Sequence, residues 1–190
     1  MMDVQSFATD DFVLEHLTDS RTHRRLLELF SVANKATGLE LYLKRRAIRD
    51  EARNESRTYL VKDVVSGELA CYFSLRTGLI TVSAGDGSFD TVPAAELSNF
   101  AVNASYSAVH RNVRKIGAYV FNKFILPVVK CIADWIGMQC LYVYALPNGK
   151  LISYYERLGF RRMSDEDAKF VYSHVKPRYD QGCVFMYMYV

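Results

Sequence analysis

The order of apolar and polar residues predicts a helix near the start of the chain. Over about residues 20–32, four apolar side chains fall on one side of a helix with about 3.6 residues per turn. They are Leu26, Leu27, Leu29 and Phe30. Because one apolar side lets a helix lie on a hydrophobic core, we expect a surface helix here.

A second amphipathic helix is expected over about residues 38–54. Its core side holds four apolar residues: Leu39, Tyr42, Leu43 and Ile48. Basic residues crowd the rest of its surface: Lys44, Arg45, Arg46, Arg49 and Arg53. Such runs are usually solvated helix faces, and Asp50 and Glu51 dilute this one. The same charges would also suit contact with nucleic-acid phosphates.

Shorter apolar runs predict strands in the middle of the chain. Two runs within residues 57–75 are separated by Ser66-Gly67, which favours an antiparallel hairpin. The stretch AGDGSFDTVP, residues 84–93, is expected to be a loop, and ELSNFAV, residues 96–102, a strand. A polar, basic loop should follow as far as Lys115.

The second half of the chain alternates helices and strands. Residues 116–136 are expected to be helical, with Pro127 kinking or splitting the helix. Residues 140–146 are apolar at almost every position, as in a strand covered on both faces, and residues 182–190 predict a last strand. The whole pattern indicates one mixed α/β domain spanning residues 1–190.

Composition narrows the class of protein. The chain has 190 residues, half of them hydrophobic, and a net charge of +3, which is too small to indicate nucleic-acid binding by itself. The N-terminus lacks the pattern of a secretory signal, and we expect no stretch to approach the roughly 18 apolar residues of a membrane span. A cytoplasmic, non-membrane protein is therefore expected.

The cysteines do not indicate a metal site or a disulfide framework. They lie in apolar segments, without a C-x-x-C pair or a histidine at ligand spacing. The four are Cys71, Cys131, Cys140 and Cys183. Buried free thiols and no bound metal are the expectation.

The stretch VRKIGAYVF, residues 113–121, is the strongest local indication of a ligand. Basic residues, a glycine and a helix start together offer free N–H groups and the positive end of a helix dipole, which suits phosphate. Arg114 and Lys115 would add charge, and Gly117 would allow a close approach of the ligand. An ordinary helix with a basic first turn has the same pattern.

Two adjacent tyrosines occupy the short helix of NGKLISYYERLGF, residues 148–160. Asn148 is a suitable N-cap residue, and Gly159 stands where a helix usually ends. Tyr154 and Tyr155 are turned about 100° from one another, so one ring is expected to pack while the other directs its hydroxyl at a partner. Two partly buried tyrosines with satisfied hydroxyls remain the structural alternative.

Four stretches in sequence order resemble the GNAT superfamily of acetyl-CoA-dependent N-acetyltransferases. ELSNFAV looks like its fourth strand, RKIGAYVF like its pyrophosphate loop and helix, CLYVYALPN like its fifth strand, and YYERLGF like its Y-x-x-x-G-F motif. The likeness covers about residues 94–163 and extends to the last strand. It implies a GNAT fold: a mixed, mostly antiparallel sheet of about six to seven strands flanked by helices.

The first half resembles the acetyltransferase toxins of bacterial toxin-antitoxin modules. LELYLKRRAIRDEARNESRTYLVKD, GELACYFSLRTG and VPAAELSNFAV carry this likeness. Those enzymes acetylate the amino group of aminoacyl-tRNA, so aminoacyl-tRNA becomes the candidate acceptor. An antitoxin and a homodimer become candidate partners.

The pyrophosphate loop departs from the family's Q/R-x-x-G-x-G/A pattern. The chain has NVRKIG, with Asn112 at the first position and Lys115 in place of the first glycine. The segment from Val102 to Gly117 is also about five residues longer than usual in the family. Lys115 can still donate its backbone N–H, so binding is expected, although the resemblance no longer implies the geometry of the first glycine.

The resemblance assigns roles to individual residues. Tyr155 would donate a proton or hydrogen bond to the leaving thiolate, and Glu96 is the candidate base, although an aminoacyl ester amine needs none. The residues implied in acetyl-CoA binding are Phe100, Ala101, Val102, Arg114, Lys115, Ile116, Gly117, Ala118 and Asn148. For Asn148 a plain helix cap is the alternative. A GNAT-fold module that binds coenzyme A or a partner without turnover is the alternative function.

Overall fold

The computed structural model describes residues 7–33, 36–84, 88–111, 113, 115–174 and 182–190. The strands are β1 (Phe12–His16), β2 (Arg57–Asp63), β3 (Leu69–Ser83), β4 (Phe89–Val102), β5 (Cys140–Ala145), β6 (Arg161–Arg162) and β7 (Val184–Tyr189). The helices are α1 (Arg21–Leu29), α2 (Thr37–Arg45), α3 (Ala47–Ala52), α4 (Ala104–Val109), α5 (Ile116–Val120), the π-helix η2 (Phe121–Ile125), α6 (Leu126–Ile136), α7 (Gly149–Arg157) and α8 (Asp165–His174).

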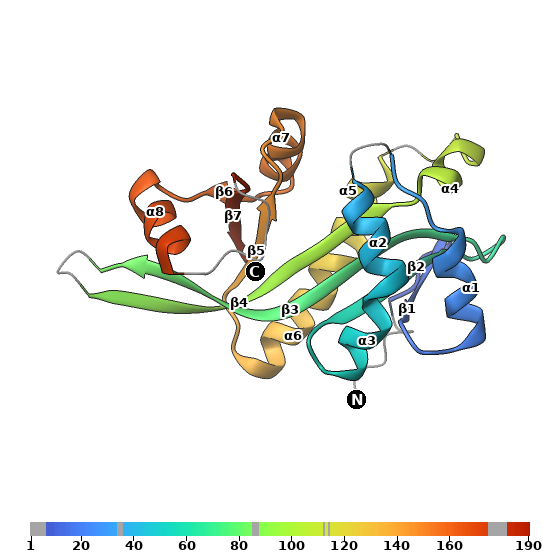
Figure 1. The fold of residues 1–190 in the computed structure, drawn as a ribbon, viewed down its shortest axis with the longest axis horizontal. Coiled ribbons are helices and arrows are strands. Elements are labelled where there is room, and N and C mark those ends of the chain that lie inside the picture. The colour runs from blue at the N-terminus through green and yellow to red at the C-terminus, as the bar shows by residue number, and fades with distance from the viewer. Residues whose placement is uncertain (1–6, 34–35, 85–87, 112, 114, 175–181) are drawn as a thin grey trace. The chain divides into compact units, whose positions relative to one another are not determined.

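The strands form a seven-stranded mixed sheet in the order β1-β2-β3-β4-β5-β7-β6 (Figure 1). Strands β4 and β5 pair in parallel. The pairs β1–β2, β2–β3, β5–β7 and β6–β7 are antiparallel. The predicted mixed α/β class with a mostly antiparallel sheet is therefore confirmed.

Contacts within the chain divide it into two compact units. The first unit comprises Met1–Arg76 and Asn99–Ile125, and the second comprises Thr77–Ser98 and Leu126–Val190. Strands β3 and β4 contribute residues to both units. The expectation of one domain over residues 1–190 stays a prediction.

The first unit is built around a core that its helices and strands share. Leu27 and Phe30 at the end of α1, Leu43 of α2, and Leu60 and Tyr72 of the sheet form one buried cluster. Burying such a side chain stabilises the fold by about 1.5–3 kcal/mol, which explains why both predicted amphipathic helices form. Helix α1 begins where the sequence predicted, since Ser20 accepts a hydrogen bond from the His23 N–H.

Three features of the first unit differ from expectation. The predicted helix 38–54 is divided at Arg46 into α2 and α3, although its apolar stripe faces the core as expected. Strand β1 and helix α4 were not predicted. Helix α4 lies within the segment expected to be a polar loop, because its two turns are held by tertiary contacts rather than by an apolar period.

The second unit contains the predicted strand 140–146 as β5, which is buried along most of its length. The expected loop 84–93 is too long, since β3 runs to Ser83 and β4 begins at Phe89. Helix α8 and the two-residue β6 were not predicted. Strand β4 therefore begins before residue 96, where the predicted strand starts. Thr91 and Val92 in this added part are both good strand formers.

The helical run Ile116–Ile136 contains a π-helical turn at Phe121–Ile125, which ends two residues before Pro127. This matches the expected disruption, because proline removes one helix hydrogen bond. The run has 21 residues and is apolar enough, by length and composition, to cross a membrane, which corrects the expectation that no stretch approaches this limit. Phe121, Phe124 and Val128 are fully buried in the protein, whereas Trp135 and Ile136 at the end of the run are exposed.

Candidate active site

The first group of predicted site residues lies at the end of β4. The side chain of Ala101 is buried in the core cluster of the first unit. Because side chains alternate along a strand, the half-buried Phe100 and Val102 lie on the opposite face. All three residues lie at the end of β4, the strand in which the resemblance places them.

Lys115 adopts the left-handed backbone conformation that glycine favours. Its φ is 56° and its ψ is 32°, and it occupies the N-cap position of α5. A non-glycine residue pays about 1–2 kcal/mol for this region, so surrounding structure must hold it there. The backbone at Lys115 therefore has a conformation that a glycine would adopt without strain.

The first turn of α5 has N–H groups that no preceding helical carbonyl can accept. The first bond of the run joins the Tyr119 N–H to the Lys115 carbonyl, at 3.1 Å. The N–H groups of Ile116, Gly117 and Ala118 lie before this first bond, so they have no partner within the helix. The side chain of the N-cap residue Lys115 makes no capping hydrogen bond, and no acidic residue stands in the first turn. The Lys115 side chain is exposed.

Two residues named for this loop fall outside the described residues. They are Arg114, expected to contact phosphate, and Asn112, at the first position of the loop pattern. Their predicted roles stay predictions.

The second group of site residues lies on α7, in the second unit. Tyr155 is 6% exposed and shares the buried side of the helix with Ile152. Its ring meets the rings of Tyr154 and Phe160 edge to face, at centroid distances of 5.5 and 5.3 Å. Burial raises the pKa of Tyr155, so its hydroxyl stays protonated and can donate a hydrogen bond.

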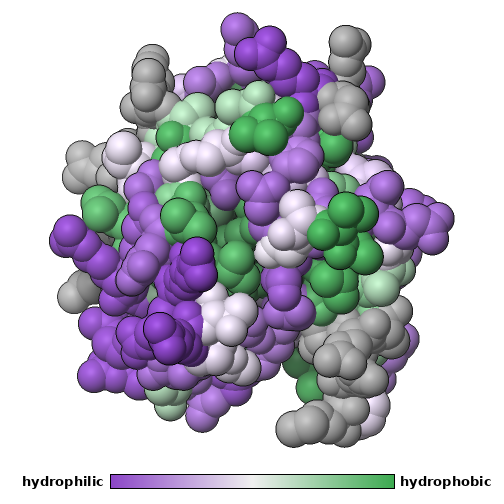
Figure 2. Space-filling view, turned by 90° about the vertical axis from the view of Figure 1, so that its right-hand side faces the viewer, coloured by the Kyte–Doolittle hydropathy of each residue, from purple (hydrophilic) through white to green (hydrophobic). Residues whose placement is uncertain are grey.

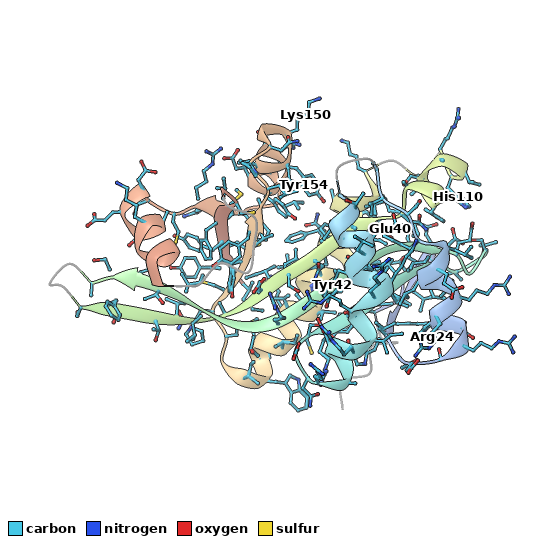
Figure 3. All side chains as sticks on the ribbon, in the orientation of Figure 1. Arg24, Glu40, Tyr42, His110, Lys150 and Tyr154 are labelled. Atoms are coloured by element: carbon cyan, nitrogen blue, oxygen red, sulfur yellow. The ribbon has the colours of Figure 1, made fainter. Side chains whose placement is uncertain are left out.

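Tyr154 has a different environment on the same helix. It is half-buried, and it lies along α7 below the outward-pointing Lys150 (Figure 3). The expectation that the two rings differ in surroundings is confirmed. Tyr155 holds the more buried position, which also fits the alternative of a core residue.

Asn148 begins α7 as a helix cap. Its side-chain oxygen accepts a hydrogen bond from the Lys150 N–H at 3.0 Å. The side chain is exposed, so its amide group remains available to a ligand. Helix α7 ends at Arg157, and Gly159 follows two residues later with a φ of 100°.

Glu96 is buried on β4, 6% exposed, opposite Tyr142 of β5. The Tyr142 hydroxyl lies 3.4 Å from Oε2 of Glu96. Tyr142 also lies against the backbone of Gly78, where an added Cβ would come within 2.2 Å of its hydroxyl oxygen. Sequence reasoning missed Tyr142 and Gly78, because a tyrosine inside a uniformly apolar strand gives no indication of a polar partner.

The parallel pairing of β4 and β5 is short. It joins Ala94, Ala95 and Glu96 to Cys140, Leu141 and Tyr142, and ends there although both strands continue. A parallel strand that ends its pairing early leaves backbone groups for another partner.

Cysteine and metal predictions can be compared with the described part of the chain. All four cysteines are free, and Cys71, Cys140 and Cys183 are buried as expected, whereas Cys131 is half-buried. Burial raises the pKa of Cys71, which makes it unreactive. Among the described residues, no three His, Cys, Asp or Glu side chains gather as metal ligands.

Comparison with solved structures shows what this fold is similar to. No family model matches the sequence. AtaT complexed with acetyl-methionyl-tRNAfMet is 19% identical at a TM-score of 0.67, over 92% of this chain and 94% of that one. A tyrosine-to-phenylalanine mutant of KacT is 16% identical at a TM-score of 0.64, over 95% of each chain.

A third structure shows an AtaT mutant toxin with the C-terminus of the antitoxin AtaR and acetyl-CoA. It is 19% identical at a TM-score of 0.60, over 95% of this chain and 94% of that one. Similarity over nearly the whole length of each chain, with a mixed seven-stranded sheet, confirms the expected architecture. This chain therefore has the GNAT fold of the AtaT and KacT toxins.

Proposed function

We propose that this chain is an acetyl-CoA-dependent N-acetyltransferase that transfers the acetyl group directly to a primary amine. The observation that carries the proposal is the left-handed turn at Lys115, which opens a helix with an uncapped first turn. Free N–H groups at the positive end of a helix dipole suit a pyrophosphate. Structures with the same fold contain acetyl-CoA, which supports this ligand.

The proposed coenzyme site uses backbone groups more than side chains. The N–H groups of Ile116, Gly117 and Ala118 bind the pyrophosphate, and Lys115 and Arg114 add positive charge. Backbone groups of Phe100 and Val102 pair with the pantetheine arm, and the N–H of Phe100 or Ala101 faces the acetyl oxygen. Asn148 contacts the pantetheine end through its side-chain amide.

The transfer step requires a neutral amine, a donor for the oxyanion and a donor for the leaving sulfur. The amine nitrogen forms a bond to the acetyl carbon, and the bond from that carbon to sulfur breaks with its electron pair on sulfur. Tyr155 donates to the resulting thiolate, for which a hydroxyl that stays protonated is suited. Tyr154 packs beside it.

The proton of the attacking amine goes to Glu96, directly or through water. Glu96 is buried beside the Tyr142 hydroxyl, which is close enough to orient its carboxylate. An aminoacyl ester amine has a lower pKa than an alkyl amine, so a larger share of it is neutral near pH 7, and with that acceptor water can take the proton.

The proposed acceptor is the α-amino group of an aminoacyl-tRNA. AtaT, complexed with acetyl-methionyl-tRNAfMet, has the same fold, which supports this class of acceptor. The basic residues of α2 and α3 are candidates for phosphate contact, but several are already in ion pairs. Lys44 pairs with Glu40 at 2.7 Å, and Arg49 pairs with Asp50 at 3.0 Å.

Arg45 and Arg46 are the best candidates in this set. Both are exposed, and neither is in an ion pair with a described residue. Arg53 lies 3.9 Å from Glu55, a weak pair. The face shown in Figure 2 is mixed, with hydrophilic side chains over much of it and separate apolar groups between them. Arg45 and Arg46 would act through phosphate charge and not through base readout.

The proposal extends to location and partners. The protein acts in the cytoplasm, where charged tRNA is found, and holds no metal. An antitoxin partner is supported by the AtaT–AtaR complexes with the same fold. A homodimer stays a candidate assembly.

Acetyl-CoA binding followed by coenzyme release tests the proposal. Calorimetry should show binding of acetyl-CoA, and coenzyme A release should rise when charged tRNA, a small amine or a peptide is added. Release with small amines or peptides alone would contradict the tRNA acceptor and leave the acetyltransferase. Binding without release across the whole panel would favour a coenzyme-binding module.

A further inference from the structure

We propose that Tyr106 and His110 of α4 are positioning residues for the coenzyme, because they hold the turn that leads into α5. This inference rests on the proposed function of that turn. Helix α4 occupies the segment that, by the resemblance, is longer than usual in the family, so this proposal gives the extra residues a role. Neither residue contacts the coenzyme in this proposal.

Both side chains extend from one face of α4 to the turn between β2 and β3. Residues four apart are neighbours on a helix surface. The Tyr106 hydroxyl donates to Oδ2 of Asp63 at 2.6 Å, and Nε2 of His110 lies 2.8 Å from Oε2 of Glu68. The Tyr106 and His110 rings stack at 4.1 Å with an interplanar angle of 19°. Figure 3 shows His110 next to α4, of which it is the C-cap residue.

The bond from Tyr106 to Asp63 is the stronger anchor. Burial would raise the pKa of Asp63, but hydrogen bonds from Tyr106 and from the N–H groups of Ser66 and Val65 lower it overall. The carboxylate is therefore charged at neutral pH, and a hydroxyl bonded to a carboxylate makes a short, strong hydrogen bond. Tyr106 is 2% exposed, which shields this bond from water.

The N-terminal end of α4 is fixed by Asn103, a buried N-cap. Its side chain accepts from the N–H groups of Ser105 at 3.1 Å and Ser31 at 3.2 Å, and donates to the Leu69 carbonyl at 2.7 Å. The Ala104 N–H also donates to the Ser31 carbonyl at 2.8 Å. Helix α4 is thus attached to β3 and to the segment after α1.

The proposed phosphate-binding turn begins where these anchors end. The Val113 N–H donates to the His110 carbonyl at 3.1 Å, and Lys115 then takes its left-handed conformation. Residues 110–115 separate α4 from α5. If α4 were released, the whole of residues 103–115 would have to be ordered when coenzyme binds. Ordering a released segment costs backbone entropy, so affinity should fall.

Two variants with matched controls test the positioning role. Tyr106→Phe removes one hydroxyl, and His110→Ala removes the pair with Glu68 and the ring stack. Tyr42→Phe and His16→Ala are the controls, since Tyr42 bonds to Ser56 at 2.9 Å and His16 pairs with Glu51 at 3.1 Å, away from α4. Acetyl-CoA affinity is measured by calorimetry, and KM and kcat by coenzyme release.

We expect Kd and KM for acetyl-CoA to rise about tenfold in both α4 variants, with kcat within about twofold of the wild type at saturation. Amide hydrogen exchange at residues 113–119 should become faster in the free variants. The controls should change none of these quantities.

Unchanged Kd in both variants, with the wild type binding normally, would overturn the positioning role and leave the proposed function standing. An equal loss in the controls would also overturn it, because general destabilisation would then be the cause. Wild-type protein that binds no acetyl-CoA would overturn the proposed function and this role with it.

Discussion

Helices α5 and α7 begin in opposite ways, although the proposed function uses the first turn of both. In α7 the Asn148 side chain accepts from the Lys150 N–H, so the protein satisfies one of the free donors itself. In α5 Lys115 has φ of 56° and offers no side-chain acceptor. The comparison teaches that the end without its own cap is the better anion site, because its donors still need a partner.

The largest expected effect on acetyl-CoA affinity comes from a substitution at Gly117, in the first turn of α5. Gly117→Asp places a carboxylate in the first turn of α5, where it suits the helix dipole but repels and displaces pyrophosphate. Acetyl-CoA affinity should fall by about 100-fold or more, which is about 2.7 kcal/mol, in calorimetry.

Two controls separate charge from size and from position. Gly117→Asn has nearly the same size without the charge, and should retain most of the affinity. Gly149→Asp puts the same carboxylate into the first turn of α7, where an added Cβ meets nothing within 4 Å. Equal loss from Gly149→Asp, or none from Gly117→Asp, would contradict the assignment of phosphate to α5.

The next effect sharpens the role of α7, whose proposed contribution is a side chain and not its backbone. Tyr155→Phe keeps the ring and removes the hydroxyl, so kcat should fall by about 100-fold with little change in acetyl-CoA affinity. Tyr154→Phe is the matched control and should change kcat by less than about threefold. If Tyr154→Phe is the damaging change, the assignment of the two tyrosines is reversed.

The two helix starts also differ in how far sequence could predict them. The cap at Asn148, the helix end at Gly159 and the different surroundings of the two tyrosines follow from residue type and helical period. The left-handed Lys115 does not, because lysine is unfavourable there and the conformation depends on neighbouring structure.

Tertiary contacts explain the other elements that sequence reasoning missed. Helix α4 has no long apolar period, and its position follows from Tyr106 and His110 bonding to acids some 40 residues earlier in the chain. The partnership of Tyr142 with Glu96 requires the parallel register of β4 and β5, which one sequence does not specify. Strong local periodicity was predictable, whereas contacts between distant segments were not.

A moderate effect on tRNA acetylation is expected from Arg45 and Arg46, which lie away from both helix starts. Changing both to Glu should lower acetylation of charged tRNA about tenfold at low salt and reduce the salt slope by about two units, one for each lost phosphate contact. Acetyl-CoA affinity should stay unchanged.

The double variant Lys130→Glu and Lys169→Glu is the control for net charge, since both lysines are exposed on other helices. It should leave the salt slope nearly unchanged. The same loss in this control would show that total charge, and not the surface of α2 and α3, decides tRNA affinity.

The smallest effect returns to the backbone of the two helix starts and needs no ligand. Lys115→Gly removes the strain of a left-handed non-glycine residue and should raise the free energy of unfolding by about 0.5–1 kcal/mol in urea denaturation. Lys150→Gly, the matched change at the helical start of α7, should lower it by about 0.5–1 kcal/mol. Asn148→Ala should lower it by about 1 kcal/mol through loss of the cap. If Lys115→Gly destabilises the protein as much as Lys150→Gly does, the turn before α5 is not strained, and the contrast between the two helix starts loses its physical basis.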